Sequence, residues 1–176
     1  MSQRSHARRP YSGHMGGRRG SRAAAVAATA VIVLTGCGVQ IPTDPAGTLD
    51  AVRETTLHAG ASPHVGFVEI DDGDVSGPEA EAVEAFADSL GADVDWTVAS
   101  EEVLVRGLEG GALDVVVAGL TDETPWAERA GMTRPYTEAT LDDGRTHKIV
   151  MLVPIGENAF LSELETFLAA YTGETR

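Results

Sequence analysis

The sequence predicts an α/β fold in which a mostly parallel sheet carries helices on both of its faces. Three observations lead to this prediction. Amphipathic helical stretches alternate with short apolar strands along the chain, one of these strands is apolar throughout, and an amphipathic helix follows the last strand. The length of 176 residues suits one domain of ordinary size plus a tail, and it argues against a multidomain enzyme.

Charge is distributed unevenly along the chain. Residues 1–36 contain six arginines and no acidic residue, whereas the remainder contains seven basic residues against all 27 acidic residues. Such an acidic body repels nucleic acid phosphates and anionic lipid headgroups, so we expect no nucleic-acid partner. The single cysteine excludes an intramolecular disulfide and a cysteine-rich zinc site.

The first 36 residues have the pattern of a bacterial export signal. Arginines precede an apolar run over 23–34, which is too short to cross a bilayer as a helix, and small residues follow it. The motif Leu34-Thr35-Gly36-Cys37 resembles the lipobox of bacterial lipoproteins. This resemblance implies that Cys37 becomes the mature N-terminus and carries acyl chains such as palmitate, which together give stable membrane anchoring. The alternative is a buried cysteine on an ordinary helix.

The mature chain divides into a tether and a lobe. Residues 38–47 contain two prolines and two glycines, a composition typical of a flexible segment. We therefore expect residues 1–36 to be a lipoprotein signal peptide, residues 37–47 a lipidated flexible tether and residues 48–173 a single folded lobe. The lipid anchor on Cys37 is expected to hold this lobe at the extracytoplasmic face of the cell membrane.

The lobe begins with a predicted helix and a predicted strand. Residues 48–58 have the spacing of a short helix that Gly60 ends, and residues 64–70 have the composition of a strand. An acidic, glycine-containing loop is expected over 71–77. The clearest helix covers 78–90, because a proline and two glutamates occupy its first turn and its apolar residues form one stripe.

The next part of the lobe continues this alternation. Residues 94–98 alternate between apolar and polar side chains, which predicts a half-buried strand. Ser100 suits the cap of the helix that follows, and the glycines at 110 and 111 end that helix. Residues 113–118 contain three consecutive valines, a run that suits a central strand buried on both faces.

Three further segments complete the predicted lobe. An irregular stretch is expected over 119–145, an apolar strand over 148–153 and an amphipathic helix over 157–171. This order of strands and helices favours a mostly parallel sheet, because helices join consecutive strands and return the chain to the same edge.

No residue pattern predicts catalysis or metal binding. The chain has no Gly-x-Ser-x-Gly nucleophile motif, its one cysteine is assigned to the lipid, and its histidines lack the spacing of metal ligands. The acidic loop matches the first half of a calcium loop, but Val83 replaces the bidentate glutamate, so a solvated turn is the preferred interpretation. We expect no enzyme activity, no catalytic residue, no metal and no cofactor.

One cluster of aromatic and polar residues is a candidate ligand site. Thr121, Trp126 and Tyr136 follow the most buried strand, at the edge where open α/β sheets place their ligands. The alternative is a packed loop in which the two aromatic rings simply cover the sheet.

Four motifs occur in order along the chain. They are a helix over 77–91 (Gly-Pro-Glu at its start, Leu-Gly at its end), the stretch 108–121 (Leu-x-x-Gly-x-x-Asp-Val-Val-Val-Ala-Gly-Leu-Thr), Arg134-Pro135-Tyr136, and the strand and helix over 148–169. In this order they resemble the first lobe of the extracellular solute-binding proteins of family 3, the amino-acid receptors of ABC importers. The resemblance implies a single lobe of a periplasmic-binding-protein-like fold. It also implies a small polar solute as ligand and a transporter permease or other membrane protein as partner.

The chain departs from this family in two ways. In the family a second lobe is inserted after the Pro-Tyr motif, whereas only 11 residues (137–147) separate Tyr136 from Lys148. The family also uses an arginine to hold the α-carboxylate of an amino acid, and Trp126 occupies its place here, with Arg129 displaced nearby. We therefore expect an uncovered half of a clamshell that lacks the usual carboxylate clamp.

The resemblance implies ligand contacts at four positions, Glu69, Thr121, Trp126 and Tyr136, and a structural role for Asp114 at the turn before its strand. A half-enclosed site buries less of a ligand than a closed one, so binding is expected to be weak. The function we predict is a lipid-anchored, extracytoplasmic solute-binding component of a transport or sensing system. Two alternatives are a pure protein–protein interaction module without a ligand site, and an enzyme, since a few relatives of this fold are dehydratases.

Overall fold

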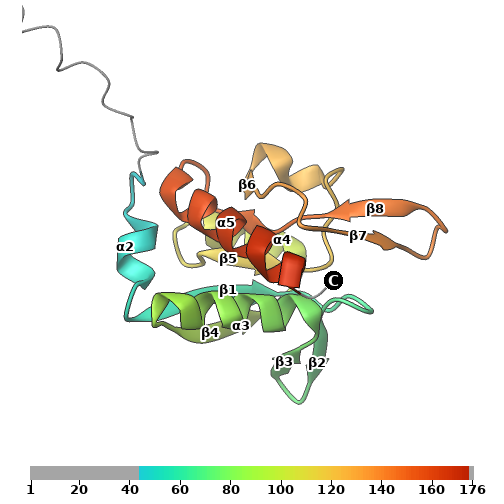
Figure 1. Cartoon of the computed structure of the whole chain (residues 1–176), viewed down its shortest axis with the longest axis horizontal. Helices are drawn as coiled ribbons and strands as arrows, with labels where there is room; N and C mark the ends of the chain where they lie inside the picture. The colour runs from blue at the N-terminus through green and yellow to red at the C-terminus, as the bar shows by residue number, and fades with distance from the viewer. Residues whose placement is uncertain (1–43, 175–176) are drawn as a thin grey trace, which may run out of the picture. The chain divides into compact units, whose positions relative to one another are not determined.

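The computed structural model describes residues 44–174, and Figure 1 shows how their helices and strands are arranged. The predicted signal peptide, Cys37 and the part of the tether that precedes Asp44 lie outside this range. No helix within the described range is both long enough and apolar enough to cross a membrane.

A five-stranded sheet forms the centre of the lobe. Its strands are β1 (Thr56–Ala61), β4 (Asp93–Val98), β5 (Val115–Val117), β6 (Gly131–Met132) and β9 (Leu152–Val153). They lie side by side in the order β4-β1-β5-β9-β6. Figure 1 labels all of these strands except β9. β4, β1 and β5 are parallel, and β9 is antiparallel to both of its neighbours. The predicted α/β fold with a mostly parallel sheet is confirmed.

Helices cover both faces of this sheet. They are α2 (Thr48–Val52), α3 (Pro78–Leu90), α4 (Glu101–Glu109), the 3-10 helix η2 (Pro125–Glu128) and α5 (Asn158–Glu174). The helices α2, α3 and α5 contribute to one apolar core, and α4 and η2 contribute to a second core on the other face. In the first core the ring of Phe86 lies 5.7 Å from that of Phe160 and 5.4 Å from that of Phe167, between centroids. These large buried rings hold α5 against α3.

The start of the lobe differs from the prediction. The helix expected over 48–58 ends at Val52, and β1 begins at Thr56, so the helical prediction for the last three residues is wrong. β1 lies between two parallel neighbours, and three of its apolar side chains are fully buried. Its place in the sheet decides its conformation, because its alanines, glycine and histidine have little preference for strands of their own.

Two hairpins lie outside the central sheet (Figure 1). β2 (Glu69–Asp71) and β3 (Asp74–Ser76) form the first, and β7 (Thr137–Thr140) and β8 (Thr146–Ile149) form the second. Asp72 and Gly73 join β2 to β3 with φ angles of 49° and 96°, as a tight hairpin turn requires. The expected acidic loop is therefore largely a hairpin, and most of the strand expected over 64–70 is a turn closed by pairing of His64 with Val68.

The remaining elements follow the prediction more closely. α3 has the predicted bounds, and β4, α4, β5 and α5 lie where they were expected. Ser100 precedes α4, but its side chain makes no capping hydrogen bond. The stretch over 119–145 was expected to be irregular and instead contains η2, β6 and β7. The strand expected over 148–153 is divided between β8 and β9, which belong to different sheets.

The last residues of the predicted tether are fixed on the lobe. The Asp44 carboxylate accepts hydrogen bonds from the N–H of Leu49 at 2.8 Å and from those of Ala159 and Phe160 at 3.1 and 3.2 Å. It thereby caps the first turns of α2 and α5 together. Residues 44–47 are consequently part of the folded lobe.

Candidate functional site

The carboxyl ends of β1 and β5 meet at one edge of the sheet, which we call the carboxyl edge. The two strands are parallel and Ala61 pairs with Val117, so the segments that leave them run side by side. A Cβ atom on Gly119 would lie only 2.6 Å from the His64 ring, and the φ of Gly119 is +59°. Only glycine fits at this point, because a side chain would be both strained and in collision. The imidazole of His64 therefore lies directly against the end of β5.

Glu79, in the first turn of α3, is a buried carboxylate at this edge. Its residue is 1% exposed, and it accepts hydrogen bonds from the Gly119 N–H at 2.7 Å and from the Tyr136 hydroxyl at 2.6 Å. Burial raises the pKa of Glu79 by more than these two hydrogen bonds lower it. Burial and the neighbouring Glu79 likewise raise the pKa of Tyr136. This pair ties α3 to the end of β5 and to the residue that precedes β7.

A cleft with a volume of about 540 Å³ lies between the turn after β1 and the β7–β8 hairpin, and we call it the hairpin cleft. Its aromatic and charged lining residues are His64, Phe67, Asp142, Asp143 and His147. The rings of His64 and Phe67 meet edge to face with centroids 5.3 Å apart. On the hairpin, His147 Nε2 lies 2.8 Å from Asp143 Oδ2. Within residues 44–174, no three His, Cys, Asp or Glu side chains are grouped so as to hold a metal ion.

Thr121 and Trp126 both belong to the segment that leaves β5. Thr121 is half-buried and pairs with Ile149 of β8, which ties this segment to the second hairpin. Trp126 lies on η2, is half-buried, and donates a hydrogen bond from Nε1 to Glu101 Oε2 at 2.7 Å. The polar atom of the indole is therefore already used within the protein, at the first residue of α4.

Arg129, the candidate nearest to the missing carboxylate clamp, is bound at the opposite end of α4. Its guanidinium donates to both carboxylate oxygens of Glu109, at 2.8 and 2.6 Å, and lies 5.6 Å from the centroid of the Trp126 ring. The hydrogen bonds from Arg129 hold the pKa of Glu109 below its usual range. Arg134 is similarly bound to Glu165 of α5, with Nε 2.8 Å from Oε2. Both arginines of this segment are therefore engaged by glutamates on helices.

The structure separates the other two predicted contacts. The hydroxyl of Tyr136 is bonded to Glu79, whereas Glu69 begins β2 and its side chain is exposed on the first hairpin. Glu69 was expected in the strand over 64–70, whereas in the structure it begins β2, outside the central sheet. The ligand-binding roles of Glu69 and Tyr136 stay predictions.

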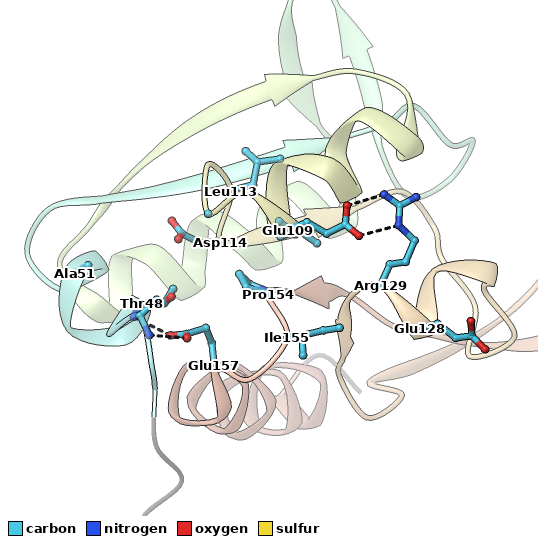
Figure 2. A pocket seen from close by; sticks show the side chains of 13 residues that line it. Thr48, Ala51, Glu109, Leu113, Asp114, Glu128, Arg129, Pro154, Ile155 and Glu157 are labelled. Atoms are coloured by element: carbon cyan, nitrogen blue, oxygen red, sulfur yellow. Dashed lines mark hydrogen bonds and ion pairs between the residues drawn. The ribbon is translucent and has the colours of Figure 1, made fainter.

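A second hollow, the amino-edge pocket, lies near the start of β5 and has a volume of about 520 Å³ (Figure 2). Four of its charged groups are paired within the protein, beginning with the pair of Glu109 and its arginine, whereas Glu128 has no partner within residues 44–174. Asp114 accepts a hydrogen bond from the His58 N–H at 2.9 Å, which fixes β5 to β1 and gives Asp114 the structural role predicted for it. Glu157 accepts one from the Thr48 N–H at 3.1 Å (Figure 2). Glu128, which is exposed, is the charged side chain left in this pocket for a ligand.

The sequence profile of the bacterial extracellular solute-binding proteins, family 3, matches residues 56–174. The chain belongs to this family. Solved structures of other proteins have a fold similar to that of this solute-binding family member. Domain 1 of TmArgBP, an arginine-binding protein from T. maritima, in its arginine-bound form, aligns with a TM-score of 0.58 at 20% identity, over 65% of this chain and 92% of that domain. The described residues thus form one lobe of the family's fold.

Two further comparisons give the range of similar proteins. An ancestral amino-acid-binding protein, AncCDT-1, described as a precursor of cyclohexadienyl dehydratase, aligns with a TM-score of 0.63 at 14% identity, over 73% of this chain and 94% of its own. Membrane-bound lytic murein transglycosylase F 2 from Alkalilimnicola ehrlichii is 45% identical over 65 residues, or 36% of this chain. Those residues are only 14% of that protein, so this solute-binding family member matches a small part of its length.

Two residues of this family member were missed by sequence reasoning. His64 was considered only as a metal ligand because β1 was not recognised, and a histidine three residues after a strand end is visible only once that strand is placed. Glu79 was explained by the dipole of α3 alone, although it is almost fully buried. The glycine and proline directly before Glu79 were the available signal, since they fix the start of the helix and so the direction of its first turn.

Proposed function

We propose that this family member is a lipid-anchored solute-binding component at the extracytoplasmic face of the cell membrane. In this proposal it binds a small polar solute weakly in the hairpin cleft and assists a membrane partner, such as a transporter permease, in transport or sensing. The observation that carries the proposal is the position of the cleft, which opens where the parallel strands end and where open α/β sheets bind ligands. We propose no enzymatic role.

The second hairpin supplies the wall that a second lobe supplies in two-lobed members of the family. After Tyr136 the chain returns at once as β7 and β8, and this hairpin borders the cleft. A hairpin encloses less of a solute than a whole lobe, so weak affinity is expected. Domain 1 of TmArgBP supports the idea that one lobe is sufficient, because its structure is described as arginine-bound.

None of the four contacts predicted from the sequence is among the residues that line the hairpin cleft, so they stay a proposal apart from it, with Thr121 and Trp126 first. Both lie on the segment that leaves β5, and Thr121 is paired with the hairpin that borders the cleft. Glu69 and Tyr136 are proposed second, because Glu69 lies on the other hairpin and the Tyr136 hydroxyl is already bonded to Glu79.

A ligand screen on the full-length protein in detergent tests the binding proposal. We expect a thermal shift with a subset of amino acids, amines or other small polar solutes, followed by a saturable heat in calorimetry. His64→Ala should abolish this response, because His64 lines the cleft. The matched control is Ile155→Ala in the amino-edge pocket, which should leave the response unchanged. Equal loss in both variants, or loss in neither, contradicts the proposed site.

The membrane anchor rests on the sequence and is tested separately. We propose that residues 1–36 are removed as a signal peptide and that Cys37 is acylated. The tether over 37–47, whose last four residues are fixed on the lobe, then connects Cys37 to the lobe over 48–173. Cells grown with labelled palmitate should yield labelled protein in the membrane fraction. Cys37→Ser should abolish the label and release the protein from that fraction. Wild-type protein found unlabelled in the cytosol would overturn the anchor.

A protein–protein interaction module is the second candidate function. Val65, at the tip of the turn after β1, is 92% exposed and borders the same cleft, a position that suits contact with a protein. A dimer that forms with rising concentration, together with no response to any solute in the screen, would favour this candidate over solute binding.

A further inference from the structure

We infer that Glu79 is the positioning residue of the hairpin cleft: it is hydrogen-bonded toward both walls of the cleft and so fixes how far apart they stand. The inference rests on the proposed function in one respect, since it takes this cleft as the solute site. Glu79 is not among the residues that line the cleft, so it acts on a solute through the residues that do.

The first wall of the cleft is the turn after β1, and the start of α3 packs directly on it. The Glu79 N–H donates a hydrogen bond to Phe67 O at 3.1 Å. A Cβ atom on Gly77 would lie 2.6 Å from the same carbonyl oxygen, so only glycine allows this close approach. The Glu79 carboxylate accepts from the Gly119 N–H, and the Gly119 backbone lies against the His64 ring. Both lining rings of this wall are therefore held in place relative to Glu79.

The second wall is the β7–β8 hairpin, which forms a two-stranded sheet apart from the central one. A lone pair of strands is marginally stable, so the position of this hairpin depends on how its base is attached. At the end of β8 the attachment is through the main chain, where the Asp122 N–H donates to Lys148 O at 3.0 Å. At the start of β7 the attachment to α3 is the Tyr136 hydroxyl, which donates to Glu79 Oε1 at 2.6 Å.

One buried carboxylate thus joins the two walls. Its Oε2 accepts from the Gly119 N–H and its Oε1 from the Tyr136 hydroxyl, so a single planar group sets the two contacts relative to each other. A buried donor that loses its acceptor has no water to replace it, which makes the arrangement costly to open. A solute then enters a cleft that is already formed and does not have to order the hairpin. When the hairpin is released, the apparent affinity falls with the fraction of molecules that keep the cleft formed.

Hydrogen exchange of backbone amides, followed by mass spectrometry on the full-length protein in detergent, tests the inference. Tyr136→Phe should raise exchange over 137–149 about tenfold, the factor expected for one buried hydrogen bond, and leave the turn over 64–68 unchanged. Glu79→Gln should stay within about twofold of the wild type. Its amide oxygen can accept from the Gly119 N–H, while its amide nitrogen donates to the Tyr136 oxygen.

Glu157→Ala is the matched control for general loss of stability. It removes two hydrogen bonds at the amino edge, away from both walls, and should leave exchange over 137–149 unchanged. If Glu157→Ala raises hairpin exchange as much as Tyr136→Phe does, the effect is general destabilisation and the inference is wrong. The inference is also wrong if Tyr136→Phe leaves the hairpin unchanged, or if Glu79→Gln releases it as fully as Tyr136→Phe.

Glu79→Ala extends the test to both walls, because it removes the acceptor for each. Exchange should rise over 64–68 as well as over 137–149, and a rise in the hairpin alone would show that Glu79 does not hold the first wall. If this variant does not fold, Tyr136→Phe and Glu79→Gln still decide the result. The solute screen is a separate measurement. If the exchange pattern is as expected and no solute binds, the proposed function fails while the positioning role of Glu79 stands.

Discussion

Two buried glutamates, one at each edge of the central sheet, have opposite pKa shifts. Glu79 at the carboxyl edge is 1% exposed and Glu157 at the amino edge is 4% exposed. Burial raises the pKa of Glu79 in spite of its two hydrogen bonds. Burial also acts to raise the pKa of Glu157, but its hydrogen bonds, led by those from the N–H groups of Ala46 and Thr48, together lower it by more, so its pKa lies below the usual range. The surroundings of Glu157 therefore favour its ionised form, whereas the surroundings of Glu79 disfavour the ionised form.

The hollows beside these glutamates also differ. In the amino-edge pocket Glu157 caps α2 and Asp114 fixes β5 to β1, while the exposed Glu128 has no partner within residues 44–174. In the hairpin cleft Asp142 likewise has no partner in the described part of the chain. The two hollows have similar volumes, and they differ in that an aromatic pair lines only the hairpin cleft.

The largest expected effect is the loss of Glu79. Glu79→Ala leaves the Gly119 N–H and the Tyr136 hydroxyl without their acceptor in a buried setting, and should lower the free energy of unfolding by about 3 kcal/mol. Tyr136→Phe removes one of these two bonds and should cost about half as much. Urea unfolding of the full-length protein measures both. Equal values for the two variants would show that the Gly119 bond contributes nothing.

The loss of Glu157 should have a smaller effect. Glu157→Ala removes the acceptor for the N–H groups of Ala46 and Thr48, and we expect unfolding to become easier by about 2 kcal/mol. Ala46 and Thr48 line the amino-edge pocket, where water can replace part of the lost hydrogen bonding. If Glu157→Ala lost more unfolding free energy than Glu79→Ala, the comparison between the two edges would be wrong.

The pH dependence of stability should distinguish the two edges by sign. The raised pKa of Glu79 means that its contribution to stability is present below its usual value of 4.5 and is lost as the pH rises through its folded-state pKa. The free energy of unfolding of Glu79→Gln should therefore increase relative to that of the wild type as the pH rises. The lowered pKa of Glu157 means that its contribution is present above 4.5 and is lost as the pH falls. The loss of unfolding free energy in Glu157→Gln, relative to the wild type, should therefore become smaller as the pH falls. Urea unfolding of both variants over a pH series measures the two slopes, and slopes of the same sign would contradict this account.

The sequence predicted the elements whose cause is local. The residues at the two ends of the helix over 78–90 predicted where it begins and ends, and three consecutive valines predicted the central strand β5. β1 could not be predicted in this way. A Cβ on Gly60 would lie 2.8 Å from Leu104 Cδ2, so this strand is composed of small residues because α4 packs closely on it. Such a constraint is set by a helix that lies 41 or more residues further along the chain.

The candidate site was predicted only in outline, for a similar reason. The carboxyl edge after β5 was expected to carry the ligand, and the missing second lobe was visible in the short spacing after Tyr136. The hairpin cleft depends on how residues 137–149 fold back, and on a contact between His64 and Gly119 that joins segments 55 residues apart. Neither follows from local pattern. Asp44 shows the same limit, since it caps a helix from 115 residues away.

The smallest expected effect concerns Thr124, on the loop that leaves β5. Its hydroxyl is buried and has no hydrogen-bond partner within the described range, so Thr124→Val should leave the free energy of unfolding unchanged or raise it by up to about 1 kcal/mol. Thr133→Val is the matched control, because the buried Thr133 hydroxyl accepts a hydrogen bond from the Met151 N–H at 3.0 Å, and its loss should cost about 1 kcal/mol or more. Equal destabilisation of the two valine variants would show that the Thr124 hydroxyl is satisfied in solution.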